Sequence, residues 1–132
     1  AIQYPAEKLK EMAEKAWLQG KKLYQERAVK LENLFEAIKN FKEADWHLET
    51  IEPKPDYYAE MLTLLSDSEN ELQDNYEQAN FRAYQAIKSH EWDKAAAQLR
   101  SICEMIPDRS DQRHAEARKK LLDVEKRQEP QR

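Results

Sequence analysis

The stretch ANFRAYQAIKSHEWDKAAAQLRSICEMIP, residues 79–107, decides the fold of this chain. Its first part repeats alanine at the helical spacings of three and four, at Ala79, Ala83 and Ala86. Its second part repeats larger apolar residues in the same way, at Trp92, Ala95, Ala96, Leu99, Ile102, Cys103 and Ile106. Such spacing places side chains on one face of a helix. The first stripe ends at Ser89 and His90, and Pro107 has no amide hydrogen with which to continue the second helix. The stretch therefore predicts a helical hairpin.

Composition extends this prediction to the whole chain. The sequence has one glycine in 132 residues and 36% charged residues. Few positions can therefore adopt the positive φ that hairpin turns between strands require. We expect an all-α protein of about five helices, forming a single domain over residues 1–127 with a disordered tail at 128–132.

The first third of the chain predicts a second hairpin. An apolar face begins after Pro5 and continues to Leu31, which indicates one long helix. Gly20 lies inside this helix and suggests that another element packs closely there. Asn33 and Glu36 have the spacing of a capping box for the next helix, which Pro53 and Pro55 should end. The face of that helix comprises Ala37, Ile38, Phe41, Ala44, Leu48 and Ile51.

Two further helices complete the prediction. From Asp56 an apolar face keeps its phase through residue 89, which favours one unusually long helix over 56–89. The alternative is a break at Ser66 to Ser68, where serines could cap a new helix. After Pro107, Asp108 or Ser110 can cap a last helix over about 109–127, whose narrow apolar stripe suits a covering role.

The hairpin over residues 79–107 resembles a tetratricopeptide repeat. The matching positions are Ala83, Trp92, Ala95, Leu99, Ile102 and Pro107. Arg82 stands where the family usually has leucine. Gly20, Ala37, Phe41 and Ala44 repeat the pattern, with about five additional residues between Gly20 and Ala37. The resemblance implies a short α-solenoid with two divergent repeats, over about 5–53 and 56–107, and a capping helix over about 109–127.

The same resemblance implies a binding mode. Family members bind a peptide or helix in a groove lined by the first helix of each repeat. By register, the groove takes Glu14, Trp17, Lys21 and Tyr24 from the first repeat and Asn80, Tyr84 and Lys88 from the second. Trp17 and Tyr24 also fit the core face, so both interpretations stay open for them. Phe81 and Tyr84 point away from the alanine face, either toward a stacked layer or toward a partner.

The sequence provides no recognisable catalytic constellation. It has no glycine-rich loop for phosphate, and its three histidines stand far apart at His47, His90 and His114. Cys103 lies on an apolar stripe and is expected to be a small buried hydrophobic residue. No apolar run is long enough to cross a membrane. We therefore expect no enzyme activity, no cofactor, no metal, no nucleic-acid binding and no membrane insertion.

Charge is distributed unevenly along the chain. The net charge is −4, but residues 43–78 carry one basic and eleven acidic groups, while residues 1–42 and 109–132 are each net basic. The favoured hypothesis is a non-catalytic protein-interaction or scaffold module that binds another protein or peptide. The alternative is a self-assembling element in which the acidic middle meets the basic ends of other copies. The chain begins with Ala1, which is typical of a processed protein or a segment of a longer or membrane-anchored one; its compartment is not indicated.

Overall fold

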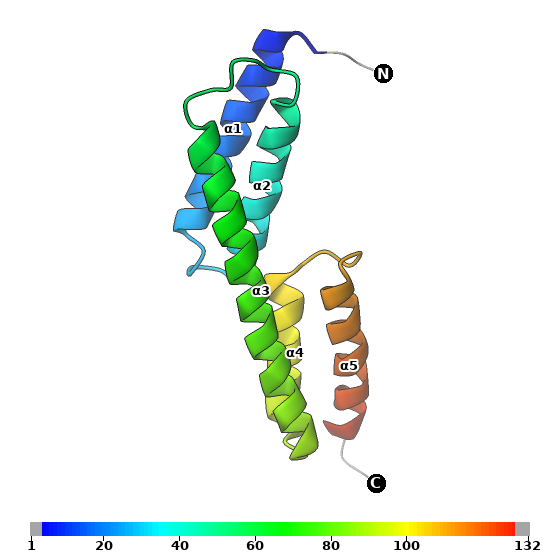
Figure 1. Cartoon of the computed structure of the whole chain (residues 1–132). Coiled ribbons are helices and arrows are strands. Elements are labelled where there is room, and N and C mark those ends of the chain that lie inside the picture. The colour runs from blue at the N-terminus through cyan, green and yellow to red at the C-terminus, as the bar shows by residue number, and fades with distance from the viewer. Residues whose placement is uncertain (1–3, 129–132) are drawn as a thin grey trace. The chain divides into compact units, whose positions relative to one another are not determined.

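The structure is a computed structural model that describes residues 4–128 (Figure 1). Within that range it contains helices and no strands, which confirms the all-α prediction. The five helices are α1 (Ala6–Gln25), α2 (Asn33–His47), α3 (Tyr58–Lys88), α4 (Trp92–Met105) and α5 (Gln112–Gln128). The continuous α3 confirms the prediction of one unusually long helix rather than a break at the serines.

The chain divides into two compact units, Ala1–Asn70 and Glu71–Arg132. The first unit contains α1, α2 and the first part of α3, and the second contains the remainder of α3 with α4 and α5. The prediction of a single domain over 1–127 stays a prediction. Gln128, placed in the predicted tail, is the last residue of α5, while residues 129–132 lie outside the described residues.

In the first unit, α1 and α2 run antiparallel and pack closely (Figure 1). Gly20 lies against the ring of Phe41 and the Cβ of Asn40, so the close approach predicted at this glycine is present. Apolar side chains from all three helices and the α2–α3 loop form the core: Ala13, Ala16, Trp17, Ala37, Phe41, Ala44, Leu48, Ile51 and Met61.

The indole of Trp17 connects α1 to α2 and to the loop before α3. It stacks on the ring of Tyr57, with centroids 5.3 Å apart and planes 4° from parallel, and it packs at a tilt on Phe41 with centroids 5.8 Å apart. Because Trp17 is only 4% exposed, it belongs to the core. Stacked aromatic pairs add stability beyond the area that they bury.

The ends of the first two helices differ from the predictions. α1 ends at Gln25, short of Leu31, which is exposed. The predicted capping box is wrong: Asn33 is already the first residue of α2, and its Nδ2 donates a hydrogen bond to the carbonyl oxygen of Glu26 at 2.8 Å. The amide side chain is therefore used to hold the connecting turn, and it makes no bond to the new helix.

α2 also ends earlier than predicted, at His47 instead of near Pro53. Leu48 and Ile51 nevertheless remain buried, because the loop after α2 folds back over the core. The ammonium of Lys54 holds this loop by donating to the carbonyl oxygens of Leu48, at 2.6 Å, and Glu49, at 3.4 Å. Apolar residues assigned to a helix face by spacing thus reach the core from a loop.

In the second unit, small residues line the buried faces of α3 and α4. Ala79, Ala83 and Ala86 are buried on α3, and Ala95 and Ala96 are buried on α4. Short side chains allow helix axes to approach closely. Larger buried side chains come from all three helices and the end of α4: Leu72, Leu99, Ile102, Met105, Ile106, Leu121 and Val124.

The turn between α3 and α4 has the geometry of a Schellman motif. His90 adopts a left-handed conformation with φ of 57°. Its amide donates to the carbonyl oxygen of Ile87 at 3.1 Å, and the amide of Glu91 donates to that of Ala86 at 2.8 Å. These are the two bonds that satisfy free carbonyls at the end of a helix. The ring of His90 stacks on Trp92, with centroids 5.1 Å apart.

The N-cap residue of α5 differs from the two that the sequence predicted. Asp111, and neither Asp108 nor Ser110, accepts a hydrogen bond from the backbone amide of Arg113 at 2.9 Å, as an N-cap residue does. Asp108 instead accepts bonds from the amide and hydroxyl of Ser110 and closes the preceding turn. The side chain of Arg113 also donates to Gln73 at 2.9 Å, which ties α5 to α3 within the second unit.

Candidate partner-binding surfaces

The predicted binding residues divide between the two units. Trp17, Lys21 and Tyr24 lie on α1 in the first unit, and Asn80, Phe81, Tyr84 and Lys88 lie on α3 in the second. The prediction that Trp17 lies on a binding surface is wrong, because its side chain is almost completely buried between Phe41 and Tyr57. The sequence left open whether Trp17 lines a groove or fills the core, and in the structure its ring fills the core.

Lys21 and Tyr24 are half-buried and make contacts within their own unit. The Lys21 ammonium lies 3.5 Å from a carboxylate oxygen of Glu60 and 5.2 Å from the centroid of the Trp17 ring. The guanidinium of Arg27 lies 4.1 Å from the centroid of Tyr24. Lys21 and Tyr24 therefore make contacts within their own unit, and only part of each side chain is exposed to solvent.

The predicted residues of the second unit are more accessible. Phe81 is 59% exposed and Tyr84 is 56% exposed. The Lys88 ammonium, one turn further along α3, lies 5.4 Å from the centroid of the Tyr84 ring. Asn80 beside them is half-buried. We call Phe81, Tyr84 and Lys88 the α3 patch. By helical spacing the patch lies away from the buried alanines of α3.

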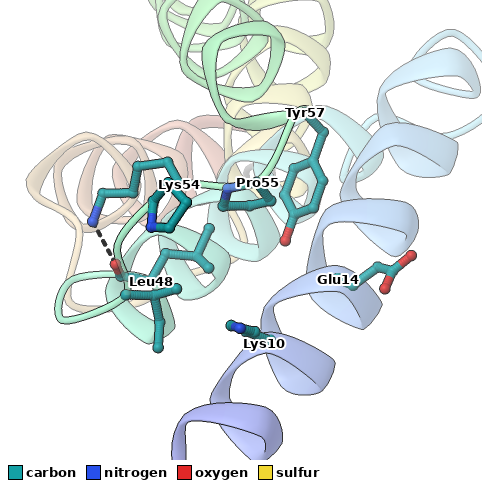
Figure 2. Close-up of a pocket in the computed structure, with 8 residues that line it drawn as sticks. Lys10, Glu14, Leu48, Lys54, Pro55 and Tyr57 are labelled. Atoms are coloured by element: carbon teal, nitrogen blue, oxygen red, sulfur yellow. Dashed lines mark hydrogen bonds between the residues drawn. The ribbon is translucent and has the colours of Figure 1, made fainter.

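A pocket of about 350 Å³ lies between α1 and the loop after α2 (Figure 2). Leu48 and Pro55 form part of its apolar wall, while Lys10, Glu14 and the hydroxyl of Tyr57 supply polar groups. Burial, with a smaller contribution from the Glu14 carboxylate, raises the pKa of the Tyr57 phenol above its ordinary value of 10.0. The phenol is therefore a neutral hydrogen-bonding group at physiological pH. This combination can hold a small polar group or a chain terminus.

Sequence reasoning missed this pocket, although it had placed Glu14 near a groove. The pocket depends on the loop after α2, which had been assigned in part to a helix. The ammonium of Lys54, at the rim of the pocket, donates a hydrogen bond to the carbonyl oxygen of Leu48 (Figure 2). It also lies 3.3 Å from a carboxylate oxygen of Glu52. The run from Pro53 to Pro55, which predicted only a helix end, was the available signal for an ordered loop.

A larger groove of about 670 Å³ lies between α1 and α2. Met12, Ala16 and Leu18 give it an apolar wall, and Lys15 and Lys22 line it as well. On its α2 side lies His47, which is 5% exposed. Neither ring nitrogen has a hydrogen-bond partner within the described part of the chain, and Nε2 lies 3.6 Å from a carboxylate oxygen of Glu43.

A third hollow, of about 260 Å³, lies in the second unit beside the turn between α3 and α4. Here the Trp92 ring is stacked on His90, and the guanidinium of Arg127 lies 5.2 Å from its centroid. Asp123 lies 3.8 Å from Arg127. Trp92, one of the residues that carried the repeat resemblance, thus anchors the end of α5 beside the turn.

Groups suited to metal or covalent chemistry are sparse in the described residues. No cluster of three or more His, Cys, Asp or Glu side chains among them is arranged to hold a metal ion. Cys103 is half-buried, and burial raises the pKa of its thiol above the ordinary 9.0, which disfavours the nucleophilic thiolate. Of the helices within residues 4–128, none combines the length and apolarity that a membrane span requires.

Comparison with models of known protein families, with curated proteins and with solved structures gives no significant match for this chain. Its function must therefore be argued from its own surfaces. The α3 patch carries two exposed aromatic side chains, and the α1–α2 groove has an apolar wall formed by Met12, Ala16 and Leu18.

Proposed function

We propose that this chain is a non-catalytic, tetratricopeptide-like interaction or scaffold module that binds its partner through the aromatic residues of the α3 patch. The partner is a peptide or helix of another protein. The observation that carries the proposal is the exposure of Phe81 and Tyr84 on adjacent turns of α3. Large aromatic residues are enriched among those that dominate binding energy at protein interfaces.

The composition of the α3 patch indicates the chemistry of the partner. Phe81 and Tyr84 provide apolar area that a partner can cover, and the Lys88 ammonium lies over the Tyr84 ring at one end of the patch. A partner with an apolar side chain next to a carboxylate can cover the aromatic area and pair with the Lys88 ammonium. The apolar contact supplies most of the affinity, while the charge at the rim mainly affects association rate and orientation.

A rigid support favours this use of the patch. Phe81 and Tyr84 project from a helix whose opposite side is buried through Ala79, Ala83 and Ala86. Their backbone is therefore held in place before a partner arrives, which lowers the entropic cost of binding. Truncating the two aromatic side chains removes more exposed than buried surface, so the fold should tolerate the change.

Affinity purification of the full chain from its native cells tests the proposal. We expect a protein partner to be recovered with the wild type and lost with Phe81→Ala/Tyr84→Ala. A matched control is Leu62→Ala/Leu122→Ala, which removes two other exposed apolar side chains, 38% and 48% exposed, and should retain the partner. Equal recovery by both double variants, with folding intact, would count against the α3 patch.

The alternative of self-assembly through the acidic middle has less support. Glu60 pairs with Lys21 at 3.5 Å and Glu69 with Lys42 at 3.5 Å, both inside the first unit. These carboxylates are partly neutralised by their own chain, so less acidic surface is available to the basic ends of other copies.

A further inference from the structure

The pocket between α1 and the loop after α2 extends to the core of the first unit (Figure 2). Leu48 and Ile51, which are 0% and 5% exposed, form part of its wall, and Pro53 and Pro55 add to the apolar side. Its volume of about 350 Å³ lies at the lower end of the range for small-molecule sites, about 300 to 1,000 Å³. The pocket therefore has the size and the apolar wall that a small ligand needs.

The loop that forms this wall is held by its own hydrogen bonds. The Lys54 ammonium donates to the carbonyl oxygens of Leu48, at 2.6 Å, and Glu49, at 3.4 Å. Proline has a fixed φ, so Pro53 and Pro55 restrict the loop further. A wall that is ordered before binding lowers the entropic cost of holding a ligand. Because Lys54 is engaged with the loop, other side chains must hold the polar end of that ligand.

The hydroxyl of Tyr57 points into the pocket. The Tyr57 ring is fixed by its stacking on Trp17, with planes 4° from parallel. Figure 2 shows the hydroxyl directed into the space beside Leu48 and Pro55, and it has no hydrogen-bond partner among the residues that the structure describes. Because burial raises the pKa of this phenol, it keeps its proton and can donate. The pocket therefore offers an oriented donor to an acceptor atom of a ligand.

The charged groups that line the pocket favour an anion. Lys10 and Lys54 contribute two ammonium groups and Glu14 contributes one carboxylate, so the lining carries a net positive charge. In Figure 2 Lys10 lies on the side toward which the Tyr57 hydroxyl points, whereas the Glu14 carboxylate points away from it. Lys10 pairs with Glu7 at 3.3 Å, but the two side chains are 51% and 88% exposed. Such surface pairs are weak, so Lys10 can turn to a ligand at little cost.

We propose that this pocket binds a carboxylate attached to an aliphatic group, from a free acid or from the carboxyl terminus of a chain with an apolar last residue. The carboxylate accepts hydrogen bonds from the Tyr57 hydroxyl and the Lys10 ammonium, and the aliphatic group packs on Leu48 and Ile51. A ligand without an acceptor would leave both donors unused. The proposal goes beyond the proposed function, because this pocket lies in the first unit and the α3 patch lies in the second.

Titration of the 132-residue chain with isocaproate, followed by the NMR shifts of backbone amides, tests the proposal. Isocaproamide is the matched ligand control, because it keeps the shape of the acid and removes the charge. Isocaproate should bind with a dissociation constant of about 1 mM and shift the amides of residues 48–57. Isocaproamide should bind about tenfold more weakly, since hydrogen bonds to an ionised group are the stronger ones. Equal binding of the two, or shifts confined to other residues, would overturn the proposal.

Variants of the two donors test the assignment of the polar contacts. Tyr57→Phe keeps the ring that stacks on Trp17 and removes only the hydroxyl, so binding of isocaproate should weaken about tenfold. Lys10→Gln should weaken it about threefold, because the ammonium is half exposed. The matched controls are Tyr24→Phe and Lys8→Gln, whose residues do not line the pocket; the Lys8 side chain is 49% exposed, close to that of Lys10. Both controls should bind as the wild type does.

Unchanged binding by the folded double variant Lys10→Gln/Tyr57→Phe, with circular dichroism as the check of folding, would contradict the proposal. So would weaker binding by Glu14→Gln, because loss of a nearby carboxylate should leave the affinity for an anion unchanged or raise it.

A second pair of ligands, acetyl-Gly-Gly-Leu and its carboxamide, identifies the source of the carboxylate. If the peptide acid binds at least as tightly as isocaproate, and its carboxamide does not, the pocket takes a carboxyl terminus. If only isocaproate binds, the pocket takes a free acid. Absence of amide shifts with both acids would overturn the proposal.

Discussion

The ring of Phe41 occupies the space that a side chain at Gly20 would need. A Cβ built on Gly20 would lie 2.7 Å from both Cδ1 and Cε1 of Phe41 and 3.2 Å from the Cβ of Asn40. Phe41 is fully buried and packs on Trp17, so its ring has little freedom to move. The close packing of α1 on α2 thus depends on the only glycine in the chain.

Gly20→Ala should lower the free energy of unfolding by about 1 to 2 kcal/mol. The overlap with Phe41 costs more than alanine gains through its better helix propensity. Urea unfolding followed by circular dichroism measures the change. In Gly20→Ala/Phe41→Leu the smaller side chain makes room, so the two changes should cost less together than their sum. Strict additivity, or a more stable Gly20→Ala, would contradict this account of the contact.

His90→Gly should raise stability by about 0.5 to 1 kcal/mol. Glycine removes the steric cost of the left-handed φ at this position, and this gain exceeds the loss of stacking on Trp92. His90→Ala keeps a Cβ in the same conformation and loses the ring, so it should be less stable than the wild type. Thermal unfolding of the three proteins gives the order of their stabilities. A His90→Ala variant as stable as His90→Gly, or more stable, would disprove the predicted energetics of the turn.

Asp111→Asn should lower stability by about 1 kcal/mol at neutral pH. Asparagine caps a helix as well as aspartate does, so the loss reports the ion pair with Arg113, whose Nη2 lies 2.9 Å from Oδ2 of Asp111. Hydrogen bonds from Arg113 lower the pKa of Asp111 below its ordinary 3.8. The wild-type advantage is therefore complete above that value and disappears as pH falls through the lowered pKa. A difference that persists in strong acid would refute the ionic explanation.

The two tryptophans of the first unit should respond differently to truncation. Trp17→Ala should cost about 3 to 5 kcal/mol, because it removes a buried ring packed between Phe41 and Tyr57. Trp46→Ala should change stability by less than about 0.5 kcal/mol, since that side chain is 71% exposed. Denaturant unfolding of both variants makes the comparison, and similar losses would show that the burial pattern is wrong.

Features that depend on neighbouring residues could be predicted from the sequence. The alanine stripe of α3, the end of α4 before Pro107 and the position of Phe81 and Tyr84 away from the alanine face all follow from helical spacing, whereas the exposure of these two rings did not. Spacing has a local cause, because side chains three and four residues apart share a helix face whatever the tertiary structure. The continuity of α3 through its serines followed from the same periodicity.

Features that depend on distant contacts could not be predicted in this way. Asn33 has the spacing of a helix cap, but its amide bonds to Glu26 across the turn. Trp17 fitted both a groove and a core, and only the stacking on Tyr57 decides between them. Nothing in the local sequence predicts that His47 is buried with neither ring nitrogen hydrogen-bonded to a described residue. For Asn33 and Trp17 the deciding contact comes from residues outside the helix that carries the spacing pattern.

Site-specific photocrosslinking in native cells tests the central claim most directly. A photoreactive phenylalanine analogue at Tyr84 probes the α3 patch, and the same analogue at Leu122, which has similar exposure, serves as the control. We predict a crosslinked protein at position 84 that is absent at position 122 and disappears when Phe81→Ala is added. Crosslinking to no protein at position 84, or to the same proteins at both positions, would contradict the proposed role of this chain.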